Sequence, residues 1–148
     1  MKVNDNPDLA QLACMVESWV KEHPNQAGMK TSAMYSLSVL ETLSQAGALL
    51  ALALEDEEGV YHGCLIAVVS GTLHSPELEA VQLAFVVSPA KRSYKTVKAL
   101  LDKYIQVSAS MGCPSPTLSN TGGYDYRIEL LYKRAGFLKA GTLFKYKE

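Results

Sequence analysis

Four basic residues stand close together in the middle of the chain and can bind an anion. Lys91, Arg92, Lys95 and Lys98 follow Ser88-Pro89, where an apolar run ends, and they open a segment with helical periodicity. The first N–H groups of a helix lack partners within it, and the helix dipole favours negative charge there. Cations at this end are unfavourable unless an anionic ligand binds. The cluster predicts a site for a pyrophosphate-like ligand; the alternative is that the long basic side chains only reach solvent.

The helix that would position this cluster is long and amphipathic. Residues of its inner face recur at helical spacing: Val97, Leu100, Leu101, Tyr104, Ile105, Ser108 and Met111. Two earlier helices are expected, one with Asn6 as its cap and Pro7 as its first residue, and one that starts at Thr31 or Ser32 and ends at Gly47. A last helix begins at Asp125 or Tyr126 and ends at Gly136.

Five segments are predicted to be strands. Residues 48–54, 60–73 and 78–87 are apolar, are separated by turn residues and predict an antiparallel meander. Residues 117–120 and 137–147 predict two later strands. Because a helix connects 78–87 to 117–120, these two strands should be parallel neighbours. The order α-α-β-β-β-α-β-α-β predicts one α/β domain over residues 1–148 with a mixed sheet, and ligands favour the point where its strands part.

Composition excludes several classes of protein. The 148 residues are 48% hydrophobic and 20% charged, with a net charge of −1, so a general nucleic-acid or membrane-surface binder is not expected. No apolar run approaches the ~20 residues of a membrane span. The three cysteines and three histidines have no metal-ligand spacing, so we expect no metal. Reduced thiols and no signal peptide predict a cytoplasmic protein.

Two local motifs resemble those of the GNAT family of N-acetyltransferases. Val87-Ser88-Pro89, then Arg92, then Leu100-Leu101 is similar to that family's coenzyme A motif. Leu131-Tyr132 with Gly136-Phe137 is similar to its second motif, Leu-Tyr, three residues, Gly-Phe. The motifs stand in the family's order with a strand between them, and the resemblance covers about residues 48–146. It implies the GNAT fold, with acetyl-coenzyme A as a co-substrate.

The phosphate-binding loop departs from the family pattern at two positions. The family carries Arg or Gln, two residues, Gly, one residue, then Gly or Ala, whereas Lys95 and Val97 stand here where small residues belong. Glycines let a backbone approach phosphate closely. Either the turn is already helical and the Lys95 ammonium contacts phosphate directly, or the chain has lost affinity for the cofactor.

The resemblance assigns residues to the cofactor. Backbone groups of Phe85 and Val87 would pair with the amides of the pantetheine arm, and the Val87 N–H would polarise the thioester carbonyl. The following residues would contact the cofactor from the loop, the helix start and the end of the 117–120 strand: Arg92, Ser93, Lys95, Thr96, Val97 and Asn120. Asp125 stands where the family often has Asn and is expected to cap the last helix.

The resemblance also suggests a general acid, and the sequence itself offers candidates for a base. Tyr132 matches the tyrosine that protonates the departing thiolate, although it also fits the core stripe of its helix. For deprotonation of an amine the sequence offers Glu79, which shares strand parity with Phe85, and next Gln82 through a bound water. His62 and His74 are further candidates for the base.

Two functions of different classes remain open. The first is an enzyme that transfers an acetyl group from acetyl-coenzyme A to an amine, either a small molecule or a protein. The second is a non-catalytic domain of the same fold that binds a protein partner, which the residues Lys95 and Val97 favour. The identity of the amine is not encoded in these motifs, and the resemblance is compatible with a homodimer.

Overall fold

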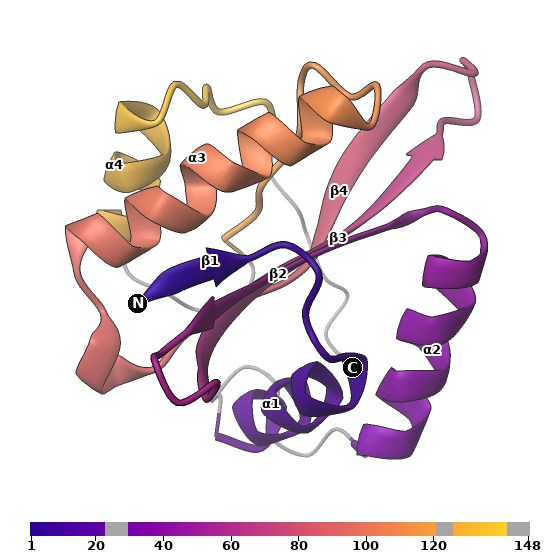
Figure 1. Ribbon diagram of the computed structural model, residues 1–148. Coiled ribbons are helices and arrows are strands. Elements are labelled where there is room, and N and C mark those ends of the chain that lie inside the picture. Colours follow the sequence, from indigo (N-terminus) through magenta and orange to yellow (C-terminus); the bar gives the residue numbers. More distant parts are fainter. Residues whose placement is uncertain (23–29, 121–125, 142–148) are drawn as a thin grey trace, which may run out of the picture.

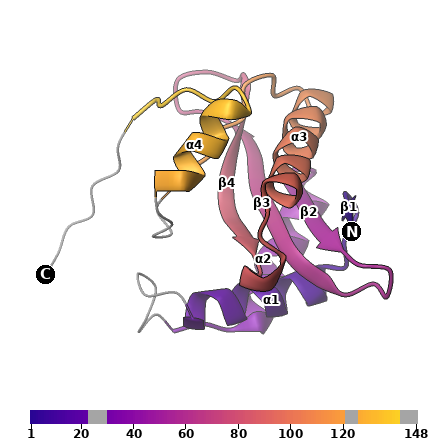
Figure 2. The same cartoon turned by 90° about the vertical axis from the view of Figure 1, so that its left-hand side faces the viewer.

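The computed structural model describes residues 1–22, 30–120 and 126–141. Within them, a four-stranded antiparallel sheet lies between two pairs of helices (Figures 1 and 2). The strands, in spatial order, are β1 (Lys2–Asn4), β2 (Leu49–Glu55), β3 (Tyr61–Gly71) and β4 (Leu78–Val87). The helices are α1 (Leu9–Glu22), α2 (Ala33–Gln45), α3 (Tyr94–Ser110) and α4 (Tyr126–Arg134).

The predicted meander is confirmed. The strands β2, β3 and β4 pair antiparallel in chain order, within the three apolar segments of the sequence. The strand β1 was not predicted, because three residues of mixed polarity carry no strand period. It forms on the outer edge of β2, with Val3 opposite Leu54.

The helix starts follow from side-chain caps. The α1 helix begins at Leu9, because the Asp8 carboxylate accepts the Gln11 N–H at 2.8 Å. The predicted start at Asn6 and Pro7 was therefore wrong. The α2 helix starts after Ser32, one of the two predicted caps, whose hydroxyl accepts a backbone N–H, and it ends before Gly47 with φ of +68°.

Each face of the sheet carries its own apolar core. One cluster lies beneath α3 and α4 and includes Leu65, Phe85, Leu100 and Tyr104. The other lies beneath α1 and α2 and includes Leu12. Because alternate residues of a strand face opposite sides, membership in either cluster reports which way a β4 side chain points.

The later strands differ from the prediction. Residues 117–120 form only one parallel bridge, between Thr117 and Val81, instead of a strand. Residues 137–141 contain no strand, and the rest of the predicted terminal strand lies outside the described residues. The same holds for Asp125, the expected cap of α4, whereas the described helix begins at Tyr126.

Two structural features are absent from residues 1–22, 30–120 and 126–141. No helix there has the length and apolar character that a membrane crossing requires. Histidine, cysteine, aspartate and glutamate side chains do not gather there in groups of three that could hold a metal ion.

Candidate functional site

A one-residue bulge interrupts β4 near its middle. Ile66 lies opposite Ala84, whereas its neighbour Ala67 lies opposite Gln82, so Leu83 is an extra residue in β4. A bulge of this kind bends the strand and shifts the side-chain alternation by one residue. The two halves of β4 therefore follow different parities.

This shift separates Glu79 from the residues with which it was grouped. Ala80 belongs to the core beneath α3 together with Phe85 and Val87, although Ala80 and Phe85 are five positions apart. Glu79, one residue before Ala80, then points to the α1/α2 face, where it lies exposed opposite Ser70. The parity argument that placed Glu79 in one site with Phe85 was wrong.

The peptide groups at the end of β4 alternate in direction. The Ser88 N–H donates to the His62 carbonyl on β3 at 2.8 Å, so the peptide groups of Ser88 face β3. By strand alternation those of Val87 and Phe85 face the outer edge of β4. The Arg92 side chain reaches this edge, where its Nε donates to the Val87 carbonyl at 2.8 Å.

The segment after α3 meets this edge at one point and then leaves it. The Thr117 N–H donates to the Ala80 carbonyl at 2.9 Å, which belongs to the parallel bridge with Val81. Two residues on, the Ser119 N–H donates to the side-chain oxygen of Gln82, at 3.1 Å. The main chains therefore part after Thr117, on the side of Phe85 and Val87.

Tyr104 holds the point where the chains part. Its hydroxyl, on a fully buried side chain of α3, lies 3.2 Å from the Ala80 carbonyl oxygen and 2.9 Å from that of Thr117. Burial raises the pKa of Tyr104, so the hydroxyl keeps its proton and donates at neutral pH. Sequence reasoning recognised Tyr104 only as a core residue, because its two acceptors are backbone groups remote in sequence.

Tyr132 lies beside the same opening. Its side chain is 8% exposed, and its hydroxyl donates to the Ser119 carbonyl at 3.1 Å. Its ring centroid is 6.2 Å from that of Phe85 and 6.3 Å from that of Phe137. Asn120 follows Ser119 and is half-buried. The structure thus places Tyr132 next to Phe85 and to the segment that ends at Asn120.

The start of α3 is closed by a capping box. The Ser93 hydroxyl accepts the Thr96 N–H, and the Thr96 hydroxyl accepts the Ser93 N–H, both at 3.1 Å. The Lys91 N–H donates to the Ser88 carbonyl at 2.9 Å. Most amides of the predicted phosphate-binding loop are therefore already bonded within the protein. The hydroxyls of Ser93 and Thr96 bond backbone groups within the protein instead of facing a ligand.

Two amides at this helix start differ from the others. The N–H groups of Tyr94 and Lys95 have no acceptor among the residues that the structure describes. They occupy the first and second positions of α3, where N–H groups point away from the helix along its axis. This leaves a pair of adjacent donors for an anion.

Positive charge surrounds these two donors. Lys91, Arg92 and Lys95 are exposed, and the first turn of α3 contains no acidic residue. Within the described part of the chain, Lys91 and Lys95 form no ion pair. Lys98 differs, because it pairs with Asp102 one turn further on, and this hydrogen bond raises the pKa of Lys98. The surplus charge is thus concentrated where the helix dipole is also positive.

The two unusual loop residues do not obstruct the helix start. Val97 is 7% exposed because its side chain packs into the core beneath α3, whereas Lys95 is exposed to solvent. No residue between Ser88 and Val97 needs the positive φ that favours glycine. Lys95 and Val97 both lie within α3, which agrees with the alternative in which the turn is already helical.

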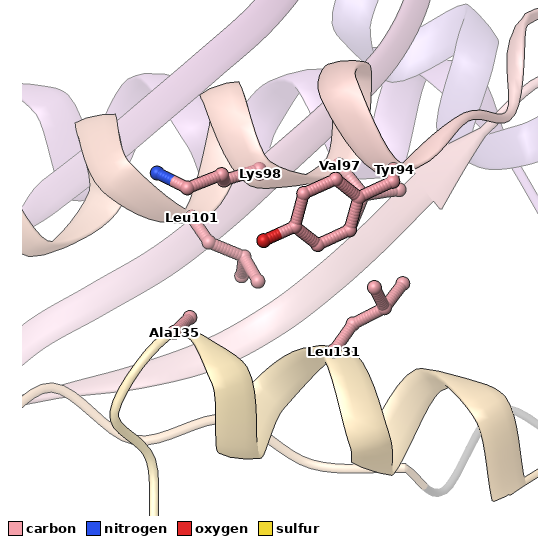
Figure 3. A pocket seen from close by; sticks show the side chains of 6 residues that line it. All are labelled: Tyr94, Val97, Lys98, Leu101, Leu131 and Ala135. Atoms are coloured by element: carbon pink, nitrogen blue, oxygen red, sulfur yellow. The ribbon is translucent and has the colours of Figure 1, made fainter.

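An apolar hollow lies between α3 and α4, next to this helix start (Figure 3). Leu131 and Ala135 point toward it from α4, and the Tyr94 ring and Leu101 lie on the α3 side. The guanidinium carbon of Arg134 stands 5.9 Å from the centre of the Tyr94 ring, which supports the ring from the other helix.

The histidines lie away from Tyr132. The Nε2 atom of His62 is 2.7 Å from a carboxylate oxygen of Asp56, at the turn between β2 and β3. This bond is the largest of the causes that lower the pKa of Asp56. His74 is exposed in the turn between β3 and β4. The structure therefore brings neither histidine together with the other candidate residues.

The capping box should stabilise the fold measurably. Replacing Ser93 by alanine removes the acceptor of the Thr96 N–H and is expected to lower the free energy of unfolding by about 1 kcal/mol. Ser110→Ala is the matched control, because Ser110 is exposed at the other end of α3 and its hydroxyl, among the described residues, bonds only the Val107 carbonyl. Urea unfolding curves measure both. Equal midpoints for the two variants would show that the box contributes nothing.

Comparison with known proteins rests on structure, since no protein-family model and no curated protein matches the sequence. Many solved structures are similar to this chain, among them the following three, which match nearly its whole length. An aminoglycoside acetyltransferase from an uncultured soil metagenomic sample is 19% identical, with a TM-score of 0.70, covering 100% of this chain and 99% of that one. Glucosamine-6-phosphate N-acetyltransferase from Arabidopsis thaliana is 14% identical, with a TM-score of 0.75, covering 99% and 98%.

The third similar structure contains a ligand. It is AAC(6')-Iy in complex with the bisubstrate analogue CoA-S-monomethyl-acetylneamine, 18% identical, with a TM-score of 0.72, covering 99% of this chain and 97% of that one. At these identities the likeness establishes the fold. The acetyltransferase fold that the GNAT-like motifs predicted is therefore confirmed.

Proposed function

We propose that this chain, which has the acetyltransferase fold, transfers an acetyl group from acetyl-coenzyme A to an amine. One observation carries the proposal. The sheet opens between β4 and residues 117–120, with outward peptide groups of β4 on one side and Tyr132 on the other. A cationic helix start, with two amides that lack acceptors in the described chain, lies at the end of the same strand.

The helix start suits the pyrophosphate of coenzyme A. The N–H groups of Tyr94 and Lys95 can donate to phosphate oxygens, and the ammonium groups of Lys91 and Lys95 can neutralise their charge. The hollow between α3 and α4 adjoins Tyr94 and is lined mainly by apolar side chains. It is too small to enclose the adenine, so we assign no part of the cofactor to it.

The outer edge of β4 suits the pantetheine arm. Peptide groups of Phe85 and Val87 face the opening and can pair with the two amides of the arm, as in an added strand. Because the pyrophosphate lies at the start of α3, which follows Val87, the thioester at the other end of the arm lies beside Phe85, whose ring is 6.2 Å from that of Tyr132. The Phe85 N–H, instead of the Val87 N–H, then stabilises negative charge on the thioester oxygen during attack. Arg92 holds the Val87 carbonyl and so fixes the orientation of this strand end. Asn120 closes the opening on the other side.

Tyr132 supplies the proton for the leaving group. The amine nitrogen attacks the thioester carbon, a C–N bond forms, the C–S bond breaks, and the thiolate takes the phenolic proton of Tyr132. In the structure the Tyr132 hydroxyl donates this proton in a hydrogen bond to the Ser119 carbonyl oxygen, at an O···O distance of 3.1 Å. The product, whose nitrogen still carries a surplus proton, loses that proton to water. The Tyr132 phenolate then takes a proton from water and becomes a phenol again.

No protein base is assigned. Glu79 is exposed on the opposite face of β4, and the Gln82 oxygen already accepts from Ser119. An amine that reaches the site in its neutral form needs only positioning next to the thioester, which is itself a large contribution to rate. We therefore expect the rate to rise with pH. The group that loses its proton is the ammonium form of the acceptor in solution and not a side chain of the protein.

Small amines are the first acceptors to test. The similar structures include an aminoglycoside acetyltransferase and a glucosamine-6-phosphate N-acetyltransferase, but also a ribosomal-protein-alanine N-acetyltransferase. We propose a small-molecule amine for this chain and retain protein N-termini and lysines in the screen.

Calorimetry with acetyl-coenzyme A and coenzyme A tests the proposal directly. We expect saturable binding of both, followed by release of free thiol when a panel of sugar amines, polyamines, aminoglycosides and peptides is added. No binding at millimolar acetyl-coenzyme A would reject the enzyme and leave the alternative, a non-catalytic domain that binds a protein partner. Binding without thiol release from any acceptor would limit the claim to the cofactor site.

A further inference from the structure

The side chain of Gln82 takes the place of a rung in the parallel ladder between β4 and residues 117–120. In a parallel pair, the N–H of every second residue of one strand bonds the carbonyl of every second residue of the other. The Thr117 N–H bonds the Ala80 carbonyl in this way. The next rung would join the Ser119 N–H to the Gln82 carbonyl. It goes instead to the Gln82 side-chain oxygen, at 3.1 Å.

This replacement moves the two main chains apart. Paired strands lie about 4.8 Å apart when peptide groups bond directly. A glutamine side chain interposes three carbons between its main chain and its amide oxygen, so Ser119 is held farther from β4 than a ladder allows. Gln82 lies opposite Ala67 and therefore faces the α3/α4 side, as Ala67 does. Ser119 is drawn to that side, where the Tyr132 hydroxyl meets its carbonyl.

Both peptide groups of Ser119 are thus held by side chains from two different elements. Gln82 comes from β4 and Tyr132 from α4, so neither bond draws Ser119 back into the sheet. The bulge at Leu83 follows Gln82 directly and turns the rest of β4 away. The opening therefore starts at Gln82, one residue after the last direct bridge at Val81.

We propose that Gln82 is a positioning residue that sets the width of the opening between β4 and Ser119, and thereby the affinity for the pantetheine arm of an acyl-coenzyme A. The role rests on the proposed function. It requires an acceptor at the Gln82 side-chain oxygen and no proton transfer by that side chain. It therefore differs from a catalytic role through a bound water.

Three substitutions separate these roles. Gln82→Met keeps the length of the side chain but removes the acceptor, Gln82→Glu keeps an acceptor, and Gln82→Asn keeps the amide but shortens its reach. Gln106→Met on the exposed side of α3 is the matched control. Calorimetry with coenzyme A, steady-state kinetics with acetyl-coenzyme A, and hydrogen exchange of the Ser119 amide are measured for each, at about 0.3 M salt to screen the added carboxylate.

We expect Gln82→Met and Gln82→Asn to bind coenzyme A on the order of tenfold more weakly, as loss of one hydrogen bond allows. The KM for acetyl-coenzyme A should rise with kcat at saturation nearly unchanged, and the Ser119 amide should exchange faster. Gln82→Glu and Gln106→Met should resemble the unmodified chain in all three measurements. If Gln82→Met does not fold, the comparison of Gln82→Asn with Gln82→Glu decides the question.

Results that contradict the positioning role can be told apart from results that contradict the proposed function. Unchanged binding in Gln82→Met or Gln82→Asn, or equally weak binding in Gln82→Glu, overturns the positioning role while the proposed function stands. A fall in kcat with unchanged KM also overturns it, because that pattern indicates participation in the chemical step. Failure of the unmodified chain to bind coenzyme A overturns the proposed function itself.

Discussion

Replacing Tyr132 by phenylalanine is expected to lower kcat by about 100-fold to 1,000-fold, with the Kd for acetyl-coenzyme A changed less than about threefold. The thiolate loses its proton donor, whereas the ring that packs against Phe85 and Phe137 remains. Single-turnover kinetics with a thiol reagent, together with calorimetry, separate the two quantities.

Tyr126→Phe is the control for this experiment. Tyr126 lies on the same helix, α4, but is 70% exposed, so loss of its hydroxyl should leave both kcat and Kd unchanged. The Tyr132 hydroxyl also bonds the Ser119 carbonyl, and its removal should cost about 1 kcal/mol of stability. Urea unfolding must therefore show that the variant is folded under assay conditions. An unchanged kcat would assign Tyr132 to packing alone.

Replacing Lys95 by glutamate is expected to have the complementary effect. The Kd for coenzyme A should rise by about 10-fold to 100-fold, because a charge-assisted hydrogen bond to phosphate contributes about 1.5–3 kcal/mol and the new carboxylate repels the ligand. Lys30→Glu alters net charge equally, and Lys30 is exposed before the start of α2, away from the helix start of α3. Calorimetry at two salt concentrations should show the difference between the variants shrinking as salt rises.

Lys95 is a sharper test of phosphate binding than Arg92. An Arg92→Glu change also removes the bond to the Val87 carbonyl and so disturbs the end of β4. Lys95 has no ion pair within the described residues, and its side chain is exposed. If Lys95→Glu and Lys30→Glu bind coenzyme A equally, the phosphates do not lie at the start of α3.

The sequence allowed the main elements to be predicted because their signals are local. The strands β2, β3 and β4 are short apolar segments between turn residues, and α3 has one apolar stripe. The motif at Val87 to Arg92 and the motif at Tyr132 then fixed the kind of fold. Both depend on residues adjacent or nearly adjacent in the chain.

The errors have a common cause in contacts that no local pattern encodes. The bulge at Leu83 depends on how β3 and β4 register, and it reversed the expected direction of Glu79. The strand β1 exists only because β2 offers an edge to Lys2–Asn4. Residues 117–120 were predicted to be a strand, but the Gln82 side chain takes the bond that would form the second rung of their ladder.

The reciprocal hydrogen bonds between Ser93 and Thr96 have a thermodynamic consequence for the binding of an anionic ligand. A segment whose shape is fixed beforehand forfeits little chain entropy when a dianion arrives. Within the described part of the chain, only two main-chain donors there lack an acceptor, so the attraction depends mainly on ammonium groups. Long-range attraction of this kind accelerates encounter and weakens steeply with ionic strength. Association with the ligand should therefore be fast and sensitive to salt. Selectivity among ligands should depend more on their total negative charge than on shape complementarity.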